Sequence, residues 1–224
     1  RKESSAASDV YKRQGKSTLV KLMNRFYDVS RGSIEINGVD IRKYNLESLR
    51  AQIGYVAQKA HMFKGSIQSN ICFGKPEASV EEMVHAATVA QASDFISTRE
   101  HGYEDEIAED GTNISGGQKQ RLSIARVILK KPSLYIYDDS FSALDFKTDA
   151  TLRKALKPEV KNAIFFVVAQ RISTIMDSDM IIVLDEGQII GMGTHAQLLK
   201  DCSVYQEIAH SQLTQKELDD YERN

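Results

Sequence analysis

The chain has 224 residues, of which 42% are hydrophobic and 27% are charged, and its formal net charge is -2. The length predicts one domain, or one domain with a small appended subdomain, and the composition excludes a disordered chain. The small net charge gives no indication of a polyanion-binding surface, so nucleic acid is not an expected partner. The two cysteines, Cys72 and Cys202, match no metal-ligand spacing and are predicted to be reduced thiols of a cytosolic protein.

The sequence contains no predicted membrane-spanning segment. Its longest apolar run, residues 163–169, has the length of a strand and falls short of the roughly 18 residues of a membrane helix. The first residues are polar and lack the apolar stretch of a secretory signal. We therefore expect any link to a membrane to depend on a partner chain or on a segment absent from this sequence.

The first half of the chain alternates between helix and strand patterns. Apolar spacing predicts a helix over residues 15–26, and a short apolar run predicts a strand over 53–57. Between them a hairpin is expected over 33–41, because Asn37–Gly38 is a favoured pair for a tight turn. A capping box at Ser79 predicts a helix that continues to about residue 92.

The second half continues this alternation. A helix is predicted from about residue 115 to 130, stopped before Pro132. Apolar runs predict buried strands over 134–137, 163–168 and 180–184, with helical segments between them. The pattern predicts an α/β fold with a mainly parallel sheet, and the mostly helical stretch from about 66 to 128 is expected to form a side subdomain.

The first motif with chemical meaning is Gly15-Lys16-Ser17-Thr18, at the start of the first predicted helix. A helix N-terminus offers backbone N–H groups to a phosphate, and a lysine and a hydroxyl suit the β/γ-phosphates and Mg²⁺. These residues match the second half of a P-loop. The first half departs from the pattern, because Val10 stands where a glycine is required and bulky residues follow it. By itself this motif is a weak indication, and a chance match is the alternative.

The second motif is the run Ile114-Ser115-Gly116-Gly117-Gln118-Lys119-Gln120-Arg121, which opens a predicted helix. It resembles the signature sequence of ABC ATPases, LSGGQ followed by a basic, Gln-rich stretch. The glycines allow the backbone to approach a phosphate closely, and Ser115 and the helix N-terminus supply donors. The alternative is a serine cap on an ordinary helix, which we consider the weaker interpretation.

The third motif is Leu134-Tyr135-Ile136-Tyr137-Asp138-Asp139, a buried strand that ends in two acids. It resembles the Walker B motif. The resemblance implies that Asp138 holds Mg²⁺, directly or through water, and that Asp139 occupies the position of the general base. The alternative, two acids capping a strand-to-loop turn, suits the motif alone but not its place shortly after the signature.

Further segments follow in the order found in ABC exporters. The run Tyr55-Val56-Ala57-Gln58 resembles the Q-loop, whose glutamine contacts Mg²⁺ and senses the membrane partner. Residues 106–111 stand where exporters contact their intracellular helices. The run Ser142-Ala143-Leu144-Asp145 matches the D-loop, and Val168-Ala169-Gln170-Arg171 is at the switch loop. The resemblance extends from residue 15 to about 212.

The resemblance implies a P-loop NTPase fold: an ABC-type ATPase core with a mainly parallel sheet, a small antiparallel β-subdomain and a helical signature subdomain. ATP and Mg²⁺ are the implied cofactors. Such domains work as head-to-tail pairs, with each ATP between the P-loop of one domain and the signature helix of the other. The implied partners are therefore a second ATP-binding domain and a transmembrane domain, at the cytoplasmic face of a membrane.

Three departures from the family pattern are informative. Residues 1–14 fit no family element, and we expect them to be non-native; residues 213–224 are expected to form a polar tail. Asp139 and Gln170 stand where the family usually has Glu and His. Aspartate places its carboxylate more than ~1 Å further from an attacking water, and a displacement of that size can cost about 100-fold in rate. Gln170 cannot carry a positive charge.

The two substitutions allow more than one interpretation. They are either neutral changes, or they weaken one site together, as in the degenerate-site subunit of heterodimeric ABC exporters, and we favour the second. Two other function classes stay open. One is a soluble ABC ATPase that acts on DNA or ribosomes, although such proteins usually carry insertions or tandem domains. The other is a regulatory module that binds ATP without hydrolysing it.

Overall fold

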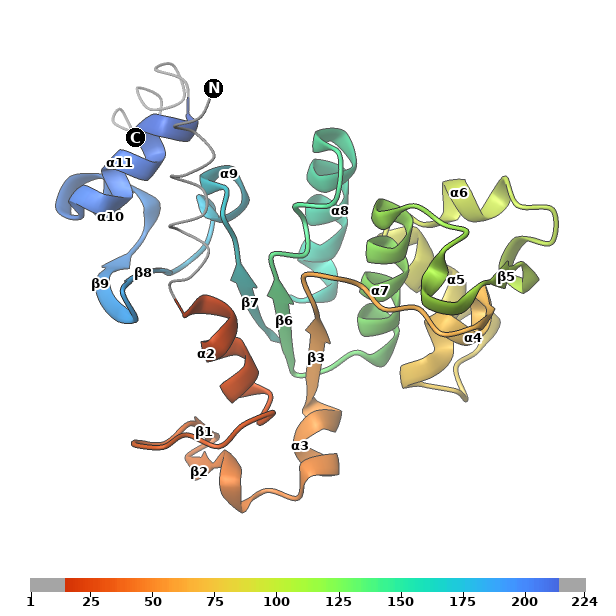
Figure 1. The fold of residues 1–224 in the computed structure, drawn as a ribbon, viewed down its shortest axis with the longest axis horizontal. Coiled ribbons are helices and arrows are strands. Elements are labelled where there is room, and N and C mark those ends of the chain that lie inside the picture. Colours follow the sequence, from red (N-terminus) through yellow and green to blue (C-terminus); the bar gives the residue numbers. More distant parts are fainter. Residues whose placement is uncertain (1–14, 214–224) are drawn as a thin grey trace. The chain divides into compact units, whose positions relative to one another are not determined.

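The computed structural model describes residues 15–213, which form two compact units with separate hydrophobic cores. The larger unit is Leu22–Val168, and the smaller unit consists of residues 15–21 and 169–213. Figure 1 shows the elements of both units. The expectations for residues 1–14, including Val10, and for the tail beyond residue 213 lie outside the described residues.

A three-stranded parallel sheet, in the order β3-β6-β7, forms the centre of the larger unit (Figure 1). Its strands are β3 (Ile53–Val56), β6 (Leu134–Asp138) and β7 (Ile164–Val168). Aromatic and branched side chains dominate these strands, as expected for a parallel sheet covered by helices. The three strands predicted here from apolar runs are confirmed.

The larger unit also contains several α-helices. They are α3 (Leu46–Gln52), α4 (Ile67–Ile71), α5 (Val80–Val89), α6 (Ser93–Ser97), α7 (Gly116–Lys130) and α8 (Phe146–Glu159). The helix α7 packs against both α5 and β3, and its buried apolar side chains belong to the main core. It ends at Lys131, whose φ of 50° is left-handed, and Pro132 follows. The predicted boundaries of α7 are thus confirmed.

Two small antiparallel pairs complete the larger unit. The strands β1 (Glu35–Ile36) and β2 (Val39–Asp40) form the predicted hairpin, with positive φ at both Asn37 and Gly38. The second pair, β4 (Gly65–Ser66) with β5 (Glu106–Ile107), was not predicted. Its two strands lie far apart in the sequence and are too short to show a periodic pattern.

The helix α2 (Lys16–Met23) begins in the smaller unit and is shorter than predicted. The sequence pattern extended the helix to Phe26, but Arg25 has a φ of 49° and its N–H donates to the carbonyl of Leu22 at 3.0 Å. This turn ends the helix before Phe26.

The remaining elements of the smaller unit follow residue 169. They are α9 (Ile172–Ile175), β8 (Ile181–Asp185), β9 (Gln188–Gly193), α10 (His195–Asp201) and α11 (Ser203–Gln212). We predicted β8 as one of the alternating strands, but among the described residues it pairs antiparallel with β9 alone. No helix in the described part of the chain has both the length and the apolar character to cross a membrane.

Candidate functional site

The predicted phosphate-binding residues lie at the start of α2. Gly15 has a φ of 87°, which favours glycine, and its carbonyl accepts the N–H of Leu19 at 3.0 Å. Lys16 and Ser17 form the first helical positions and are half-buried, and the first turn contains no acidic side chain. The first backbone N–H groups of a helix have no acceptor within the helix itself, and for this reason helix starts are common binding sites for anions.

The predicted switch residue, Gln170, also belongs to the smaller unit, just before α9. Its carbonyl accepts a hydrogen bond from Nε2 of Gln212 at 2.9 Å, and Oε1 of Gln212 accepts the N–H of Ile172 at 2.8 Å. Gln212, at the end of α11, therefore fixes the backbone on both sides of Arg171. Sequence reasoning missed this role, because nothing local marks a glutamine 42 residues away as a partner.

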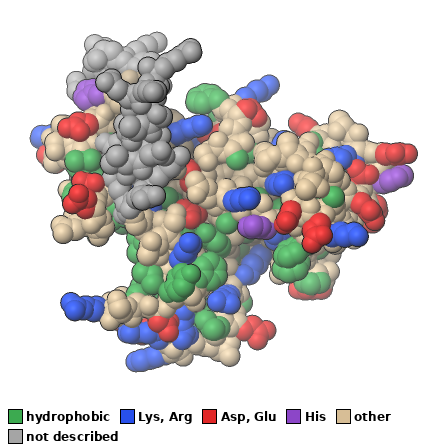
Figure 2. All heavy atoms as spheres, viewed as in Figure 1, with side chains coloured by type: hydrophobic (Ala, Val, Ile, Leu, Met, Phe, Trp, Pro, Cys, Tyr) green, Lys and Arg blue, Asp and Glu red, His purple; other side chains and the backbone are tan. Residues whose placement is uncertain are grey.

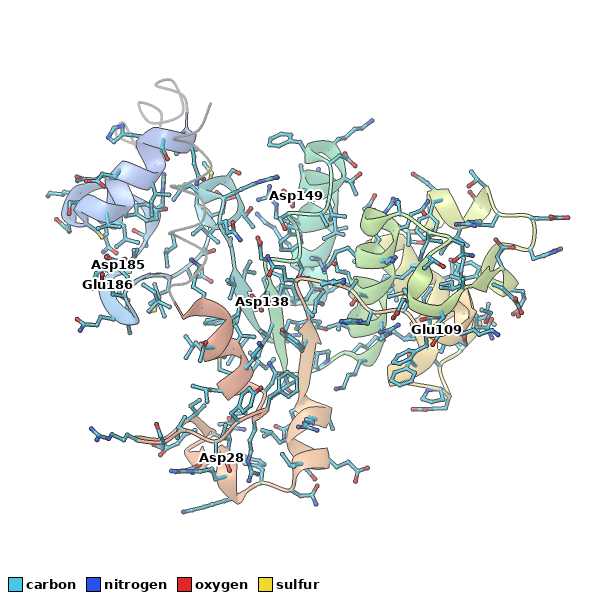
Figure 3. The ribbon with its side chains drawn as sticks, viewed as in Figure 1. Asp28, Glu109, Asp138, Asp149, Asp185 and Glu186 are labelled. Carbon is cyan, nitrogen blue, oxygen red and sulfur yellow. The ribbon has the colours of Figure 1, made fainter. Side chains whose placement is uncertain are left out.

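Asp138 ends β6, the central strand of the parallel sheet (Figure 3). Only 4% of this residue is exposed. The hydroxyl of Tyr55, on the neighbouring strand β3, donates to Oδ2 of Asp138 at 3.3 Å. Burial and the adjacent negative charge of Asp138 raise the pKa of Tyr55 to about 12, so the phenol keeps its proton at neutral pH. Tyr55 belongs to the run that resembles the Q-loop, but the sequence pattern indicates no role for its hydroxyl.

Asp139 follows in a left-handed conformation, with a φ of 49°, and is 8% exposed. Nε2 of Gln58 donates to Oδ2 of Asp139 at 3.0 Å, across 81 residues of sequence. The N–H of Asp139 donates to the carbonyl of Val168, and the hydroxyl of Ser142 donates to the carbonyl of Asp139. The structure therefore places Gln58 directly beside Asp139. The hydrogen bonds to Val168 and Ser142 hold the backbone N–H and carbonyl of Asp139 in place.

The signature run opens α7 as predicted. Ser115 caps the helix through a reciprocal capping box: its Oγ accepts the N–H of Gln118 at 3.2 Å, and Oε1 of Gln118 accepts the N–H of Ser115 at 2.9 Å. Ser115 and Gly116 are exposed, and Gly116 has open space where a Cβ would stand. The helix start is therefore accessible to a molecule outside the larger unit.

Two hydrogen bonds, one part-buried and one buried, connect the residues just before Gln58 with the other motifs. Nε2 of Gln120, on α7, donates to the carbonyl of Ala57 at 3.1 Å. The hydroxyl of Ser140 donates to the carbonyl of Val56 at 2.9 Å. The Q-loop run is thus tied both to the signature helix and to the turn after β6. The roles of Gln120 and Ser140 were not predicted, because each bond joins segments more than 60 residues apart.

The D-loop run, residues 142–145, leads from this turn into α8. Asp145 caps α8: Oδ1 accepts the N–H of Thr148 at 2.9 Å and Oδ2 accepts its hydroxyl at 2.6 Å. These hydrogen bonds lower the pKa of Asp145 below its usual range. A Cβ on Gly117 would stand 3.4 Å from the carbonyl of Ala143, so the signature helix and the D-loop run pack closely within one unit.

The residues present suit a metal only as part of a metal–nucleotide complex. The described residues contain no group of three or more His, Cys, Asp or Glu side chains able to hold a metal ion. Asp138 nevertheless ends β6, Asp139 follows it, and the side chain of Gln58 contacts Asp139, so oxygen ligands are present at this end of the sheet. Magnesium is usually held by one or two carboxylates together with the phosphates of a substrate. The donor set therefore fits Mg²⁺ that arrives with ATP.

Comparisons with known proteins agree with the arrangement of motifs. The family model described as ABC transporter matches residues 14–142. The chain is 47% identical to "Putative multidrug export ATP-binding/permease protein YgaD" of Bacillus subtilis, over 87% of this chain and 33% of the relative. It is 42% identical to heavy metal tolerance factor 1 of Caenorhabditis elegans, over 90% of this chain and 25% of that protein. The chain thus spans a quarter to a third of these relatives.

A solved structure gives a similar result for the fold. A bacterial Atm1-family ABC exporter with ATP bound aligns with a TM-score of 0.86 and 39% identity. The alignment covers 88% of this chain and 35% of the exporter chain.

Proposed function

The chain belongs to the ABC transporter family, and from that premise we propose that it is the ATP-binding and ATP-hydrolysing domain of an ABC exporter. The observation that carries the proposal is the pair Asp138 and Asp139 at the end of β6, with Gln58 at 3.0 Å from Asp139. The exposed, glycine-rich start of α7 supports it, because it suits a phosphate brought by a second domain.

The proposed roles follow the family motifs residue by residue. Gly15, Lys16, Ser17 and Thr18 bind the phosphates, with the Lys16 ammonium at the β/γ-phosphates. The family motifs assign Mg²⁺ to Ser17, Gln58 and Asp138, whose oxygens would hold the ion, and the ion would neutralise negative charge on the phosphates. Asp139 accepts the proton of the attacking water, and Gln170 is the switch residue.

Two partners follow from this function. The run Ser115-Gly116-Gly117-Gln118 completes the ATP site of a second ATP-binding domain, which packs head-to-tail on the D-loop run, residues 142–145. The second partner is a transmembrane domain, which places the assembly at the cytoplasmic face of a membrane. Both partners are supported by the similarity to exporters, of which this chain covers about a third.

An aromatic surface on the larger unit suits the transmembrane partner. The rings of Phe63 and Phe73 stack at 4.3 Å, although 47% and 59% of these residues are exposed. The guanidinium of Arg126 lies beneath both rings, at 5.4 and 5.6 Å from their centroids. Figure 2 shows hydrophobic side chains on the visible face in the region of α4. Exposed stacked aromatics of this kind are typical of an interface.

The loop of residues 106–111 lies next to this surface. Gly65 follows Phe63 by two residues, and the pairing of β4 with β5 sets Gly65 opposite Ile107. Lys119 donates to the carbonyl of Asp110 at 2.7 Å, so α7 also holds the loop. We assign Phe63, Phe73 and residues 106–111 to the docking surface for the intracellular helices of the transmembrane domain.

The proposal includes an asymmetry between two sites. Asp139 and Gln170 make ATP hydrolysis slow at the chain's own ATP site. The signature run of this chain is intact, and it completes a second ATP site, on a different partner subunit, where hydrolysis is fast. In an assembled heterodimer, Ser115→Ala should remove most ATPase turnover, and Asp139→Ala should cost comparatively little. Equal losses from both variants would contradict the asymmetry and identify Asp139 as a fully working base.

The hydrolytic function itself is tested by single-turnover ATP hydrolysis in the assembled transporter. We expect ADP formation at the chain's own site, lost in both Lys16→Ala and Asp138→Asn. Tyr137→Phe is the matched control, because it changes a buried residue of the same strand whose hydroxyl has no partner among the described residues. ATP binding without any ADP at this site would contradict hydrolysis and favour a regulatory module.

A further inference from the structure

Tyr55 has a contact that its position in the strand does not require. Backbone pairing sets Tyr55 opposite Ile136 on β6, yet its hydroxyl extends along the sheet to Oδ2 of Asp138, two residues further on. The distance is 3.3 Å, and the two residues are 83 apart in the sequence. The hydroxyl of Tyr55 therefore forms a specific hydrogen bond with Asp138, the buried carboxylate at the end of the central strand.

The ring of Tyr55 is held by its neighbours. Phe26 packs edge-on against it, with centroids 5.7 Å apart and planes at 74°. The guanidinium of Arg50 in turn lies 5.6 Å from the centre of the Phe26 ring. A ring that is fixed in this way directs its hydroxyl to one place, so the hydrogen bond restricts the orientation of the carboxylate of Asp138.

The two acids at the end of β6 are held by different donors from the same segment. Tyr55 donates to Asp138, and Gln58 donates to Asp139. The nearby Tyr137 shows the contrast, because its hydroxyl is buried without a hydrogen-bond partner among the described residues. Burial of a tyrosine in this sheet is therefore not enough to bring its hydroxyl to a carboxylate, and the contact of Tyr55 with Asp138 is specific to Tyr55.

We propose that Tyr55 is a positioning residue for Asp138, and that its hydroxyl holds this carboxylate in the orientation that the metal–nucleotide complex requires. This inference rests on the proposed role of Asp138 in binding Mg²⁺. Hydrogen-bond partners of metal-binding carboxylates fix the orientation of those ligands, and their loss typically weakens metal binding about 10- to 100-fold.

The test measures metal binding directly. Mn²⁺ replaces Mg²⁺, and the loss of the free Mn²⁺ signal in electron paramagnetic resonance is titrated at a saturating concentration of a non-hydrolysable ATP analogue. Tyr55→Phe removes the hydroxyl and keeps the ring that packs on Phe26. Tyr137→Phe is the matched control, since it removes a hydroxyl from the same sheet that donates to no described residue. Asp138→Asn reports separately on the proposed metal ligand.

We expect Tyr55→Phe to weaken Mn²⁺ binding about 10-fold, the lower end of the range for such partners. Thermal unfolding should stay close to wild type, and Tyr137→Phe should bind Mn²⁺ as wild type does. Unchanged or tighter binding in Tyr55→Phe would overturn the inference, as would equal weakening in both tyrosine variants. If Asp138→Asn weakened binding while Tyr55→Phe did not, only the role of Tyr55 would fail. Unchanged binding in Asp138→Asn would overturn the proposed metal role itself.

Discussion

At the scale of single residues, Asp139 combines two unusual properties. It is the residue proposed as the general base, where the resemblance to ABC ATPases leads us to expect a glutamate, and it adopts a left-handed backbone with a φ of 49°. Aspartate and asparagine tolerate this conformation better than most residues, because their short polar side chains can form local hydrogen bonds. Here the carboxylate accepts from Gln58, and the backbone N–H donates to the carbonyl of Val168.

The shorter side chain leads to a prediction about rate. Asp139→Glu extends the carboxylate by one methylene toward the water, so we expect turnover at this site to rise about 10-fold, within the range expected for repositioning a reactive group. Single-turnover ATP hydrolysis in the assembled transporter measures the change. Asp139→Asn, of the same length but without the basic carboxylate, is the control and should be slower than wild type. A glutamate variant no faster than wild type would show that side-chain length does not limit this site.

At the scale of elements, capping boxes at two helices allow stability and function to be separated. Ser115 caps α7 and Ser79 caps α5 through the same reciprocal pair of hydrogen bonds. Only the start of α7 carries the glycines proposed to meet a phosphate. The two serines therefore share a structural role, and the proposal gives one of them a second role.

We expect Ser115→Ala and Ser79→Ala to lower the free energy of unfolding by similar amounts, about 1 kcal/mol each, the usual effect of losing a cap. Only Ser115→Ala should reduce the ATPase activity of the assembled transporter. Chemical denaturation and steady-state ATPase assays measure the two effects. If Ser79→Ala reduced ATPase activity as much, the effect of Ser115→Ala would be a consequence of lost stability.

The smaller unit contains a buried histidine that links α10 to α11. Nδ1 of His195 is 2.7 Å from the hydroxyl of Tyr205, and 2% of His195 is exposed. Burial lowers the pKa of His195 from its usual value of 6.5, with a smaller opposing effect from the charge of Asp177. The unfolded chain therefore binds a proton at a higher pH than the folded chain does.

This shift predicts lower stability in mild acid. As the pH falls below about 6.5, the unfolded state gains a proton first, so the free energy of unfolding should decrease until the folded-state pKa is passed. Thermal unfolding between pH 7.5 and pH 5 measures the slope. His195→Gln removes the titrating group and should flatten this part of the profile. An equally steep profile in His195→Gln would assign the acid sensitivity to other groups.

At the scale of the whole molecule, the main proposal is that ATP hydrolysis is transmitted to a membrane domain. The exposed stack of Phe63 and Phe73 on Arg126 is the surface we assign to that contact. Burial lowers the pKa of Arg126 to about 10, so it remains charged at neutral pH beneath the rings. Its guanidinium also donates to the carbonyl of Asn70 at 2.8 Å, which fixes the base of this surface.

Removing one ring should separate ATP binding from transport. Phe73→Ser is expected to leave nucleotide affinity of the chain unchanged and to lower transport by the assembled protein about 10-fold, a loss of the order found for an aromatic residue at the centre of an interface. Vesicle transport assays and nucleotide titration measure the two quantities. Val80→Ser is the control, because Val80 is also an exposed apolar residue of the larger unit but lies outside the proposed surface. Unchanged transport in Phe73→Ser would contradict the assignment of this surface.

The amino-acid sequence by itself determined the features that depend on neighbouring residues. The turn at Asn37–Gly38, the cap at Ser79 and the start and end of α7 were all predicted, because turns and caps are formed by hydrogen bonds within a few residues. The motif order also identified the family, since the spacing of such runs is a property of the sequence alone.

Only the tertiary structure decided which distant groups meet. The contacts of Tyr55 with Asp138 and of Gln58 with Asp139 depend on the parallel pairing of β3 with β6. The pairing of β4 with β5 depends likewise on the packing of the core around it. Strand partners and register are selected by the burial of many apolar side chains together, and no short segment of sequence contains that information.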